Sequence, residues 1–498
     1  MIRLSGPART AAVGLAAAAL AFGAARGTAS VQLAAPHEVA GLPESSDVLV
    51  EDATLVCPGQ QRVGGESLRD VAGTVAVATA AAPVVSLPQS LTETPSGAGT
   101  VAVSSGGAPA PLVTGTARAQ QRAATVAGTS TDPVLVTGAG GLAPGLVGTQ
   151  TWRHRGDDDR GLVVTPCQVP SSDVWLVGGG GGPSRTERVI VSNPGANAVA
   201  VSLDLYGSKG AVTADQARGL SVPPRGRIVL SLDALAPGEV SPAVHVIATG
   251  GVVSAVLDEA WIDGATGRGI DDATRSASPA TDLVVPGVDV NGVTGLRLVN
   301  PGAAEALVQV RVLTATGPKQ PAELRAVRVP AESTKDVWLD LPAGGVGFRL
   351  VSDQPVTAGA YVERRAATGA DRMGDFGWAP ATSAVRSTAG LLLPGLEGAA
   401  ASTSLLLSAA SAASAAQVTV TLGTGDAATS TVVTVPADST VTVPVGAATS
   451  LWLRVDSGEV HAAATVGGVD GGVPFFSVAA ITGAPVSALA IPVRQVRR

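Results

Sequence analysis

The sequence is poor in aromatic residues, charged residues, cysteine and histidine. Aromatic residues make up 3% and charged residues 15% of the 498 residues, with 2 cysteines and 4 histidines. Its net charge of -7 leaves no basic surface of the kind that neutralises many phosphates, so we expect no nucleic-acid partner. Because large rings are scarce, we expect cores filled by Val, Leu and Ala in two-layer sheets.

The scarcity of histidine and cysteine also excludes common catalytic and metal-binding patterns. His37, His154, His245 and His461 are far apart, and neither HExxH nor CxxC occurs. The sequence has no Gly-x-Ser-x-Gly elbow and no SxxK followed by KTG, which mark two classes of serine enzyme. We therefore expect no enzymatic activity, no metal site and no cofactor.

Residues 1–29 have the pattern of a secretory signal. Arg3 and Arg9 give a positively charged start, residues 11–25 form an apolar run, and small residues precede Ser30. We expect export to the extracellular space or the cell envelope. The apolar run is shorter than the about 20 residues of a membrane span, and an uncleaved N-terminal anchor is the alternative. No second stretch of the sequence is long and apolar enough to cross a bilayer.

Cys57 and Cys167 are the only cysteines of the sequence. An even pair in an exported chain predicts an intramolecular disulfide. Such a bond would join the start of an N-terminal module to its end. Closing a loop of this size stabilises a fold by up to about 4–5 kcal/mol in the chain-entropy model.

Runs that alternate or cluster β-branched residues, bounded by Gly, Pro, Asn and Asp, predict strands along most of the chain. Residues 188–207 and 295–317 share a strand pattern, an Asn-Pro-Gly turn and a longer strand pattern. In this turn we expect Pro to set φ and Gly to accept a positive φ. Val-Pro steps at Val222, Val329 and Val435 precede a further strand in three segments.

A third shared pattern predicts a β-hairpin in each repeat, with Gly251, Pro355 and Glu459 in its turn. The repeats have roughly one hundred residues, the size of an immunoglobulin-like sandwich. In the last repeat, the Asn-Pro-Gly turn is replaced by residues 408–410.

These patterns predict an all-β protein, in which an N-terminal disulfide-closed β module precedes three tandem immunoglobulin-like or related β-sandwich repeats. The N-terminal module does not match the repeat sequence. The expected boundaries are 1–29 for the signal peptide or anchor, 30–172 for the N-terminal β module, and 173–281, 282–386 and 387–498 for the three repeats.

The stretch from Cys167 to Gly179 reads Cys-x-x-Pro-x-x-x-x-Trp-x-x-Gly-Gly and is followed by RVIVSNPG and GLSVPPRGRIVLSLD. In these pieces the sequence resembles the secreted actinobacterial proteins grouped as domain of unknown function 5719, over roughly residues 54–481. The resemblance implies export, β-rich repeats and paired cysteines. The family has no established activity, so the resemblance supplies no catalytic residue.

The most polar segment is TWRHRGDDDRG, residues 151–161. Its aspartates fit a divalent cation, its arginines fit an anionic glycan, and Trp152 offers a face for stacking on a sugar. Because the spacing is not that of an EF-hand, the alternative is a solvated loop whose charges neutralise one another. The candidate ligand loop comprises Trp152, Arg153, His154, Arg155, Asp157, Asp158, Asp159 and Arg160.

Acidic residues follow the last predicted hairpin of two repeats, and we expect them in loops. They fit solubilising linkers, calcium binding at the joints, or the acid and base of glycoside hydrolysis. The other tryptophans lie mainly beside strand patterns and are expected to anchor cores. The acidic residues are Asp258, Glu259, Asp263, Asp271, Asp272, Glu363, Asp371 and Asp375, and the tryptophans are Trp175, Trp261, Trp338, Trp378 and Trp452.

Two functional hypotheses follow. In the first, a non-enzymatic envelope protein uses its repeats as a spacer and docking surface for wall polymer or another exported protein. In the second, a carbohydrate-active enzyme or carbohydrate-binding module uses residues 151–160 or the paired carboxylates. A membrane is expected as a partner only through an uncleaved N-terminal segment.

Overall fold

The computed structural model describes Ser46 to Ala490, apart from residues 67, 90, 92–94, 96–97, 157–158, 182–183, 367–371, 394–399, 412–413 and 426. The predicted signal, residues 1–29, lies outside the described residues. Residues 49–488 form one compact body. Strands β1 (Ser46–Leu49) and β36 (Ser487–Ala490) form a separate two-stranded sheet. Among the described residues, no helix has the length and apolar character needed to span a bilayer.

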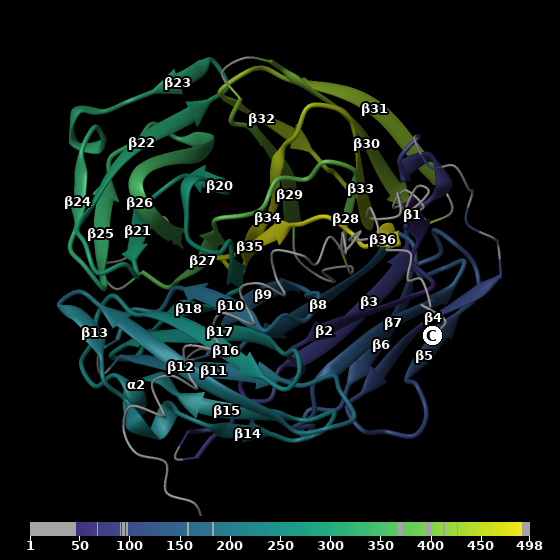
Figure 1. The fold of residues 1–498 in the computed structure, drawn as a ribbon, viewed down its shortest axis with the longest axis horizontal. Coiled ribbons are helices and arrows are strands. Elements are labelled where there is room, and N and C mark those ends of the chain that lie inside the picture. The colour runs from purple at the N-terminus through teal and green to yellow at the C-terminus, as the bar shows by residue number, and fades with distance from the viewer. Residues whose placement is uncertain are drawn as a thin grey trace, which may run out of the picture. The chain divides into compact units, whose positions relative to one another are not determined.

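The body consists of β-sheets, in which the strands pair antiparallel apart from a single bridge between two modules. This confirms the prediction of an all-β protein. We divide the strands into modules I to IV, which cover residues 52–166, 173–276, 280–380 and 388–481 and follow one another in colour in Figure 1.

Modules I and II each contain two sheets. Module I contains β2 (Asp52–Cys57), β3 (Thr74–Ala81), η1 (Val84–Ser86), β4 (Gly99–Ser105), β5 (Val113–Gly115), β6 (Arg122–Val126), β7 (Val134–Gly140), β8 (Leu146–His154) and β9 (Gly161–Pro166). Module II contains β10 (Asp173–Val177), β11 (Arg185–Ser192), β12 (Val199–Gly207), β13 (Gly210–Val212), η2 (Asp215–Ala217), β14 (Leu220–Val222), β15 (Arg227–Ser231), α2 (Leu232–Leu235), β16 (Ala243–Thr249), β17 (Ser254–Asp263), β18 (Thr266–Ala273) and β19 (Arg275–Ser276).

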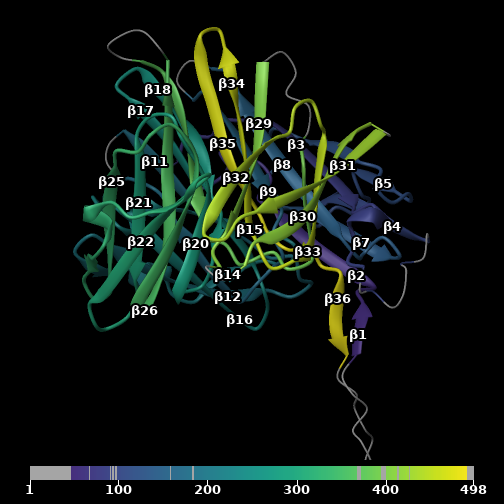
Figure 2. The ribbon, with the colours of Figure 1, turned by 90° about the horizontal axis from the view of Figure 1, so that it is seen from above.

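Modules III and IV also contain two sheets each, and the hairpin of β34 and β35 can be followed in Figure 2. Module III contains β20 (Ala280–Val290), β21 (Thr294–Asn300), β22 (Ala306–Thr314), β23 (Gly317–Lys319), η3 (Ala322–Leu324), β24 (Val327–Val329), β25 (Ser333–Leu339), β26 (Gly344–Arg365) and β27 (Gly374–Pro380). Module IV contains β28 (Thr388–Leu392), β29 (Ala400–Ala409), β30 (Ala416–Thr424), β31 (Ala427–Val435), β32 (Ser439–Pro444), β33 (Ser450–Ser457), β34 (His461–Asp470) and β35 (Val473–Ile481).

All four modules have the same strand order. The first, sixth, third and fourth strands pair in one layer, and the fifth, second, seventh and eighth pair in the other. The bridge between β12 and β25 and the long strand β26 join both layers of module III and one layer of module II into a 14-stranded sheet. In modules II and III the fourth strand is split in two, as β13 with β14 and as β23 with β24. In module III the long β26 supplies both the sixth and the seventh strand. Module I therefore has the same strand order as modules II to IV, although its sequence does not match theirs.

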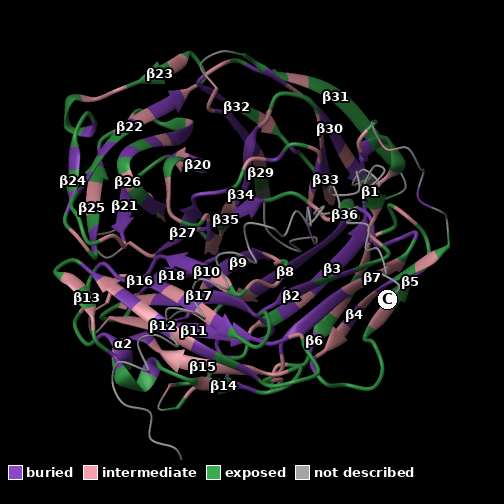
Figure 3. Cartoon of the chain, viewed as in Figure 1, coloured by how far each residue is buried: buried purple, intermediate pink, exposed green. Residues whose placement is uncertain are grey.

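The strands form where small apolar residues alternate with polar ones. In β12, Val199, Val201, Leu203 and Leu205 are buried and the residues between them are not, so one face of the strand lies on the core. Val189 of β11, in the opposite sheet, belongs to the same core. The core between the two sheets of module II consists mainly of Val, Leu and Ala, as the composition predicted. The buried stretches of the strands can be followed in Figure 3.

A left-handed residue marks the turn between the fourth and fifth strands of each module. Ala119, Arg225, Glu332 and Asp438 have φ of 63°, 48°, 51° and 45°. Among the described residues these are the non-glycine residues with positive φ, a conformation that side chains other than glycine disfavour. Its recurrence once in each module supports their common architecture.

A buried asparagine hydrogen-bonds each Asn-Pro-Gly turn to the turn between the fourth and fifth strands of its module. Asn300 Nδ2 donates to the carbonyl oxygens of Ala304 at 2.7 Å, Val329 at 3.1 Å and Pro330 at 3.0 Å, and its Oδ1 accepts from Gly302 N at 3.0 Å. The equivalent Asn193 makes the same four contacts. The Asn-Pro-Gly motif and the Val-Pro motif are therefore hydrogen-bonded to each other.

The role predicted for the glycine of this motif is wrong. Neither Gly195 nor Gly302 has a positive φ. A Cβ on these glycines would lie 3.1 Å from Oδ1 of Asn193 and 3.2 Å from Oδ1 of Asn300. The glycine is there because the asparagine side chain approaches the backbone closely.

Replacing the buried asparagine of module III will destabilise the protein. Asn300→Ala leaves three carbonyl oxygens and one N–H group without their partner, and we expect the free energy of unfolding to fall by about 3 kcal/mol. Denaturant unfolding followed by tryptophan fluorescence measures the loss. The exposed Asn197→Ala is the control and should change stability by less than about 0.5 kcal/mol. Equal stability of the two variants would show that the anchor contributes nothing.

The β-hairpins predicted around Gly251, Pro355 and Glu459 are not formed. The sixth strand of each module pairs in one sheet and the seventh pairs in the other. In module II, for example, β16 pairs with β10 and β12, whereas β17 pairs with β11 and β18. Two adjacent alternating runs suit a hairpin equally well, because alternation alone does not identify the partner strand.

The predicted disulfide between Cys57 and Cys167 is confirmed. The two Cα atoms are 4.4 Å apart, and the cysteines are 110 positions apart in the sequence. Cys57 ends β2 and Cys167 follows β9, so the bond joins the first and last strands of module I. Both side chains are buried.

Within residues 49–488 the modules pack in a closed cycle. Each module places residues of its seventh or eighth strand into the core of the module before it, and module I does so to module IV. The inserted residues are Ala260 and Ile270 in module I, Tyr361, Phe376 and Trp378 in module II, Ala463, Phe476 and Val478 in module III, and Leu162 and Val164 in module IV. The eighth strands β9, β18, β27 and β35 consequently meet one another, as their neighbouring labels in Figure 1 indicate.

Candidate functional site

One buried carboxylate, that of Asp375, contacts all four modules. Its Oδ1 accepts hydrogen bonds from Ile270 N and Phe376 N, both at 3.1 Å. Its Oδ2 accepts from Phe476 N at 2.9 Å and from Leu162 N at 3.2 Å. These donors belong to β18, β27, β35 and β9, which are the eighth strands of the four modules. Asp375 therefore receives one backbone N–H group from each module.

The surroundings of Asp375 fit a structural carboxylate. Burial raises the pKa of Asp375 well above its ordinary value, while the four N–H groups act in the opposite direction by favouring the ionised form. Two carboxylate oxygens have about four acceptor positions, and here all four are filled by backbone N–H groups. No position is left for a substrate proton, which argues against general acid or base catalysis by this residue.

Asp271 makes a second connection between modules beside Asp375. Its Oδ2 accepts from Trp378 N at 2.7 Å, and its Oδ1 accepts from Ser477 Oγ at 3.1 Å. Ser477 Oγ in turn accepts from Val164 N at 2.9 Å. Burial raises the pKa of Asp271, and the nearby Asp272 and Asp375 add to the shift. Asp271 and Ser477 thus extend the connection to the same four modules.

Asp272 joins modules I and II. Its Oδ2 accepts from Thr165 Oγ1 at 2.6 Å and from Gln61 Nε2 at 2.9 Å. Burial raises the pKa of Asp272 to about 7, and the cross-strand neighbour Asp258 contributes to the shift. Asp258 is itself paired with Arg62 at 2.9 Å, so its negative charge has a partner.

Stability should fall with rising pH because of Asp272. The unfolded chain ionises this carboxyl above about pH 4, whereas the folded protein keeps it protonated up to about pH 7. Between these values the group lowers the free energy of unfolding by roughly 1.4 kcal/mol per pH unit. We expect Asp272→Asn to reduce the slope between pH 5 and pH 7, to which Asp271 and Asp375 also contribute, measured by denaturant unfolding at several pH values. The exposed Asp340→Asn should leave the wild-type slope, and an unchanged slope in Asp272→Asn would disprove the assignment.

A further group of polar residues joins modules II and III. Arg297 donates to the carbonyl oxygens of Gly178 and Gly179, both at 2.8 Å, and pairs with Asp336 at 2.8 Å. Trp378 Nε1 donates to Glu259 Oε2 at 2.8 Å. The glycines that follow the tryptophan of β10 thus present backbone oxygens to an arginine of the next module.

The acidic residues predicted to lie in loops lie mostly on strands and are buried, so the loop prediction is wrong for them. Five of the buried side chains have a hydrogen-bonding or charged partner in a neighbouring module, whereas Glu363 pairs with Arg365 of its own strand. Their burial excludes a role as solubilising linkers. Asp263 is half-exposed at the end of β17 and pairs with Arg268, and Asp371 lies outside the described residues. The buried residues are Asp258 and Glu259 on β17, Asp271 and Asp272 on β18, Glu363 on β26 and Asp375 on β27.

Part of the candidate ligand loop lies on a strand, part lies in a described loop, and part lies outside the described residues. Trp152, Arg153 and His154 belong to β8, and Trp152 is fully buried in the core of module I. The prediction that Trp152 offers a face to a sugar is therefore wrong, because its ring packs inward. Asp157 and Asp158 lie outside the described residues, so cation binding by them stays a prediction.

The remaining charges of this segment have protein partners. Arg153 and Arg155 lie 3.4 Å and 3.2 Å from Oδ2 of Asp470, and Arg160 donates to the Asp470 carbonyl oxygen at 2.8 Å. These contacts connect modules I and IV. Asp159 is buried and pairs with Arg69 at 2.7 Å and with Arg62 at 3.7 Å. His154 Nδ1 lies 3.0 Å from the Asp159 carbonyl oxygen.

The described histidines lie apart from one another. His245 is on β16, where its ring stacks on Trp175 with centroids 4.0 Å apart. His461 is on β34, and burial lowers its pKa to about 4, so it is neutral at physiological pH. No group of three or more His, Cys, Asp and Glu side chains among the described residues is arranged to hold a metal ion.

The tryptophans predicted as core anchors differ in how far they are buried. Trp175, Trp378 and Trp452 are buried, as predicted. Trp338 on β25 is 62% exposed, so the prediction is wrong for it. A Cβ on its cross-strand neighbour Gly295 would lie 2.9 Å from the indole ring, which places the ring over the glycine. Tyr361 meets the ring edge-on, with centroids 6.1 Å apart.

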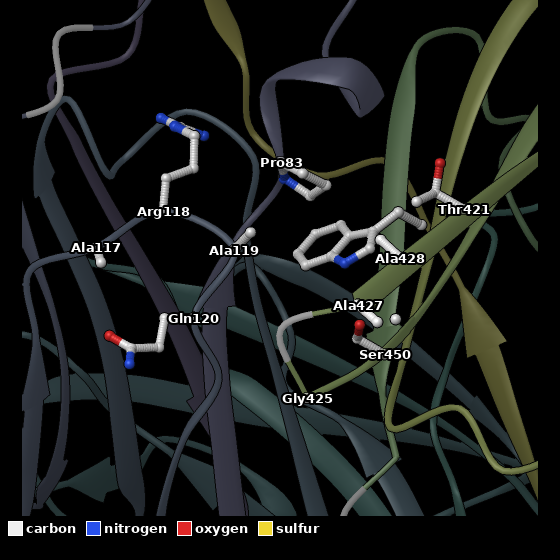
Figure 4. A pocket seen from close by; sticks show the side chains of 12 residues that line it. Pro83, Ala117, Arg118, Ala119, Gln120, Thr421, Gly425, Ala427, Ala428 and Ser450 are labelled. Atoms are coloured by element: carbon white, nitrogen blue, oxygen red, sulfur yellow. The ribbon is translucent and has the colours of Figure 1, made fainter.

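A pocket of about 340 Å³ lies between modules I and IV. In Figure 4, Arg118 and Gln120 of module I lie on one side and Thr421 and Ser450 of module IV on the other. Arg118 donates to the carbonyl oxygens of Ala82 at 2.7 Å and Pro144 at 2.9 Å. Since Arg118 is the one charged side chain of the lining and is already bonded, the pocket suits a small neutral polar molecule.

Comparison with known proteins agrees with the resemblance seen in the sequence. A family model described as "Family of unknown function (DUF5719)" matches residues 113–446, which is more than half of the chain. No curated protein matches the chain.

Proposed function

Because this chain belongs to DUF5719, a family of unknown function, we propose its role from its own residues: it is an exported, non-catalytic protein of the cell envelope that binds wall polymer. Export is inferred from residues 1–29, with their charged start and apolar run. The alternative docking partner is another exported protein.

The proposal that the protein is not catalytic is supported by the buried carboxylates, because they already have hydrogen-bonding or charged partners within the protein. Asp375 has four backbone donors, Asp271 accepts from Trp378 N and Ser477 Oγ, and Asp258 is paired with arginine. A glycosidase needs two carboxyl groups that face a substrate across an open space. Carboxylates buried at joints between modules hold the modules together instead.

The binding part is supported by Trp338. Trp338 is 62% exposed, and its ring rests over Gly295 of the neighbouring strand β21. An exposed indole face packs well against the C–H groups of a sugar ring, while its edge stays near water. Tryptophan is enriched at protein interfaces relative to the rest of the protein surface.

The experiment uses isolated cell-wall sacculi. Purified residues 30–498 are incubated with the sacculi, the pelleted protein is measured, and the supernatant is assayed for released sugars and peptides. We expect retention without release, and we expect Trp338→Ala to lower the retained fraction severalfold. Leu307→Ala, which also alters an exposed apolar side chain of module III, is the control and should bind as wild type. Released fragments would support a carbohydrate-active enzyme, and no retention would contradict wall binding.

Export can be tested separately. Mass spectrometry of the protein from the culture medium or envelope fraction should find a mature chain that begins at Ser30. An N-terminus at Met1 in the membrane fraction would indicate the uncleaved anchor, and protein found in the cytoplasm alone would contradict export.

We also propose that the four modules are copies of one immunoglobulin-like β-sandwich. Support comes from the shared strand order and from the left-handed residue in each turn between the fourth and fifth strands. An experimental structure in which one module has a different strand order would contradict a common origin.

A further inference from the structure

The fourth strand of a module lies at a sheet edge, and three modules keep this edge short. β5, β13, β14, β23 and β24 have three residues each. In modules II and III the 3-10 helices η2 and η3 interrupt the edge. Charged residues lie along these two interrupted edges, among them Lys209, Asp215, Arg218, Lys319, Glu323 and Arg328. Short, interrupted and charged edges prevent pairing with another chain.

Module IV has none of these protections. β31 runs for nine residues without interruption, and among the described strands it is hydrogen-bonded to β30 alone. Its sequence, AATSTVVTV, contains no charged residue, glycine or proline. Residues 427–432 are exposed without a break (Figure 3). Ala427 and Ala428 line the pocket between modules I and IV, whereas residues 429–432 are not part of that lining. Val432 is 63% exposed.

We propose that two copies of this chain associate by antiparallel pairing of their β31 strands. A free strand edge presents a row of backbone N–H and C=O groups, which bond to water in the isolated chain and can pair with another strand. Because β31 is uncharged, a second β31 meets no repulsion, whereas a charged partner strand finds no complementary charge. Its Thr, Ser and Val side chains are self-complementary, since Thr opposite Thr or Ser forms a favourable cross-strand pair.

Antiparallel pairing also limits the assembly to two chains. Identical strands that run in opposite directions are related by a two-fold axis. The free edge of each β31 is then paired with the other, so a third chain has no β31 edge to bind. The pairing joins β30 and β31 of both chains into one continuous sheet. The dimer would present two copies of the proposed wall-binding surface, although the pairing itself does not depend on that function.

The test is sedimentation of the full chain over a range of concentrations. We expect the wild type to show twice the chain mass at high concentration. The double variant Thr429→Lys, Thr431→Lys places like charges opposite one another across the axis, and we expect it to sediment as a monomer. Because both positions are exposed, lysine fits there without disturbing the core.

Charge reversal separates self-pairing from other contacts. The variant Thr429→Glu, Thr431→Glu should also be monomeric, and an equal mixture of the lysine and glutamate variants should again form dimers. The control Thr429→Ser, Thr431→Ser, which keeps the strand uncharged, should dimerise as wild type. Circular dichroism confirms that the variants keep their β structure. A wild type that is monomeric at all concentrations, a dimeric lysine variant or a mixture that stays monomeric would each overturn the proposal.

Discussion

Asp375→Ala will lower the free energy of unfolding by at least about 4 kcal/mol. The substitution leaves four buried N–H groups without acceptors, and each such group costs about 1–3 kcal/mol. It also removes hydrogen bonds that join β9, β18, β27 and β35 to one side chain. Guanidinium unfolding measured by tryptophan fluorescence gives the value.

Two companion variants make this result specific. Asp375→Asn keeps one oxygen but turns an NH₂ group toward two N–H donors, so its loss should approach that of the alanine variant. Asp340→Asn removes an exposed carboxylate and should leave stability within about 0.5 kcal/mol of wild type. If Asp375→Ala lost less than about 1 kcal/mol, the proposed role of this carboxylate would be wrong.

Removing the disulfide has the second largest expected effect. The bond between Cys57 and Cys167 closes a segment of more than one hundred residues, since 110 positions separate the two cysteines. In the chain-entropy model, opening a loop of this length destabilises the folded state by about 4–5 kcal/mol. We expect the double variant Cys57→Ser, Cys167→Ser to show this loss in denaturant unfolding.

Reduction supplies the control for the disulfide. Wild-type protein unfolded in the presence of a reductant should match the double serine variant, while the reductant should not affect the variant itself. A variant as stable as the oxidised wild type would mean that packing of β2 and β9 alone holds the ends of module I together.

Short-range patterns in the sequence predicted the all-β class, and an even pair of cysteines in a chain expected to be exported predicted the disulfide. Alternation of Val and Leu with polar residues reflects burial of one face of a strand, and this pattern is local. The Asn-Pro-Gly and Val-Pro motifs could also be recognised in the sequence, but the hydrogen bonds between them could not be predicted. Asn300 and the Val-Pro step at Val329 are far apart in sequence, and only the fold shows that the amide of one bonds the carbonyl of the other.

The similarity of module I to the repeats could not be predicted from the same signals. It lacks the Asn-Pro-Gly turn and the Val-Pro step, so self-similarity of sequence ends at the start of module II. What the modules share is strand order and a left-handed residue such as Ala119, and alanine gives no local indication of positive φ.

The carboxylates of the candidate site could be identified in the sequence, but their burial could not be predicted. Asp and Glu are rarely fully buried, which favours a loop when they follow a strand pattern. Asp258 and Asp271 are buried because their partners come from other modules. A signal was present, since Asp258 directly follows the apolar run of β17 and precedes Trp261 on the same strand. Trp338 shows the opposite case, because nothing in an alternating strand tells which face remains uncovered.

Hydrogen exchange in wild type and Asp375→Asn tests most directly whether one carboxylate holds four modules together. Peptides that contain Leu162, Ile270, Phe376 and Phe476 report on the four N–H donors separately. We predict that protection falls together in β9, β18, β27 and β35, while β31 and other distant strands exchange as in wild type. Loss of protection confined to β27 would contradict the account, because the effect would then stay within the module that contains Asp375.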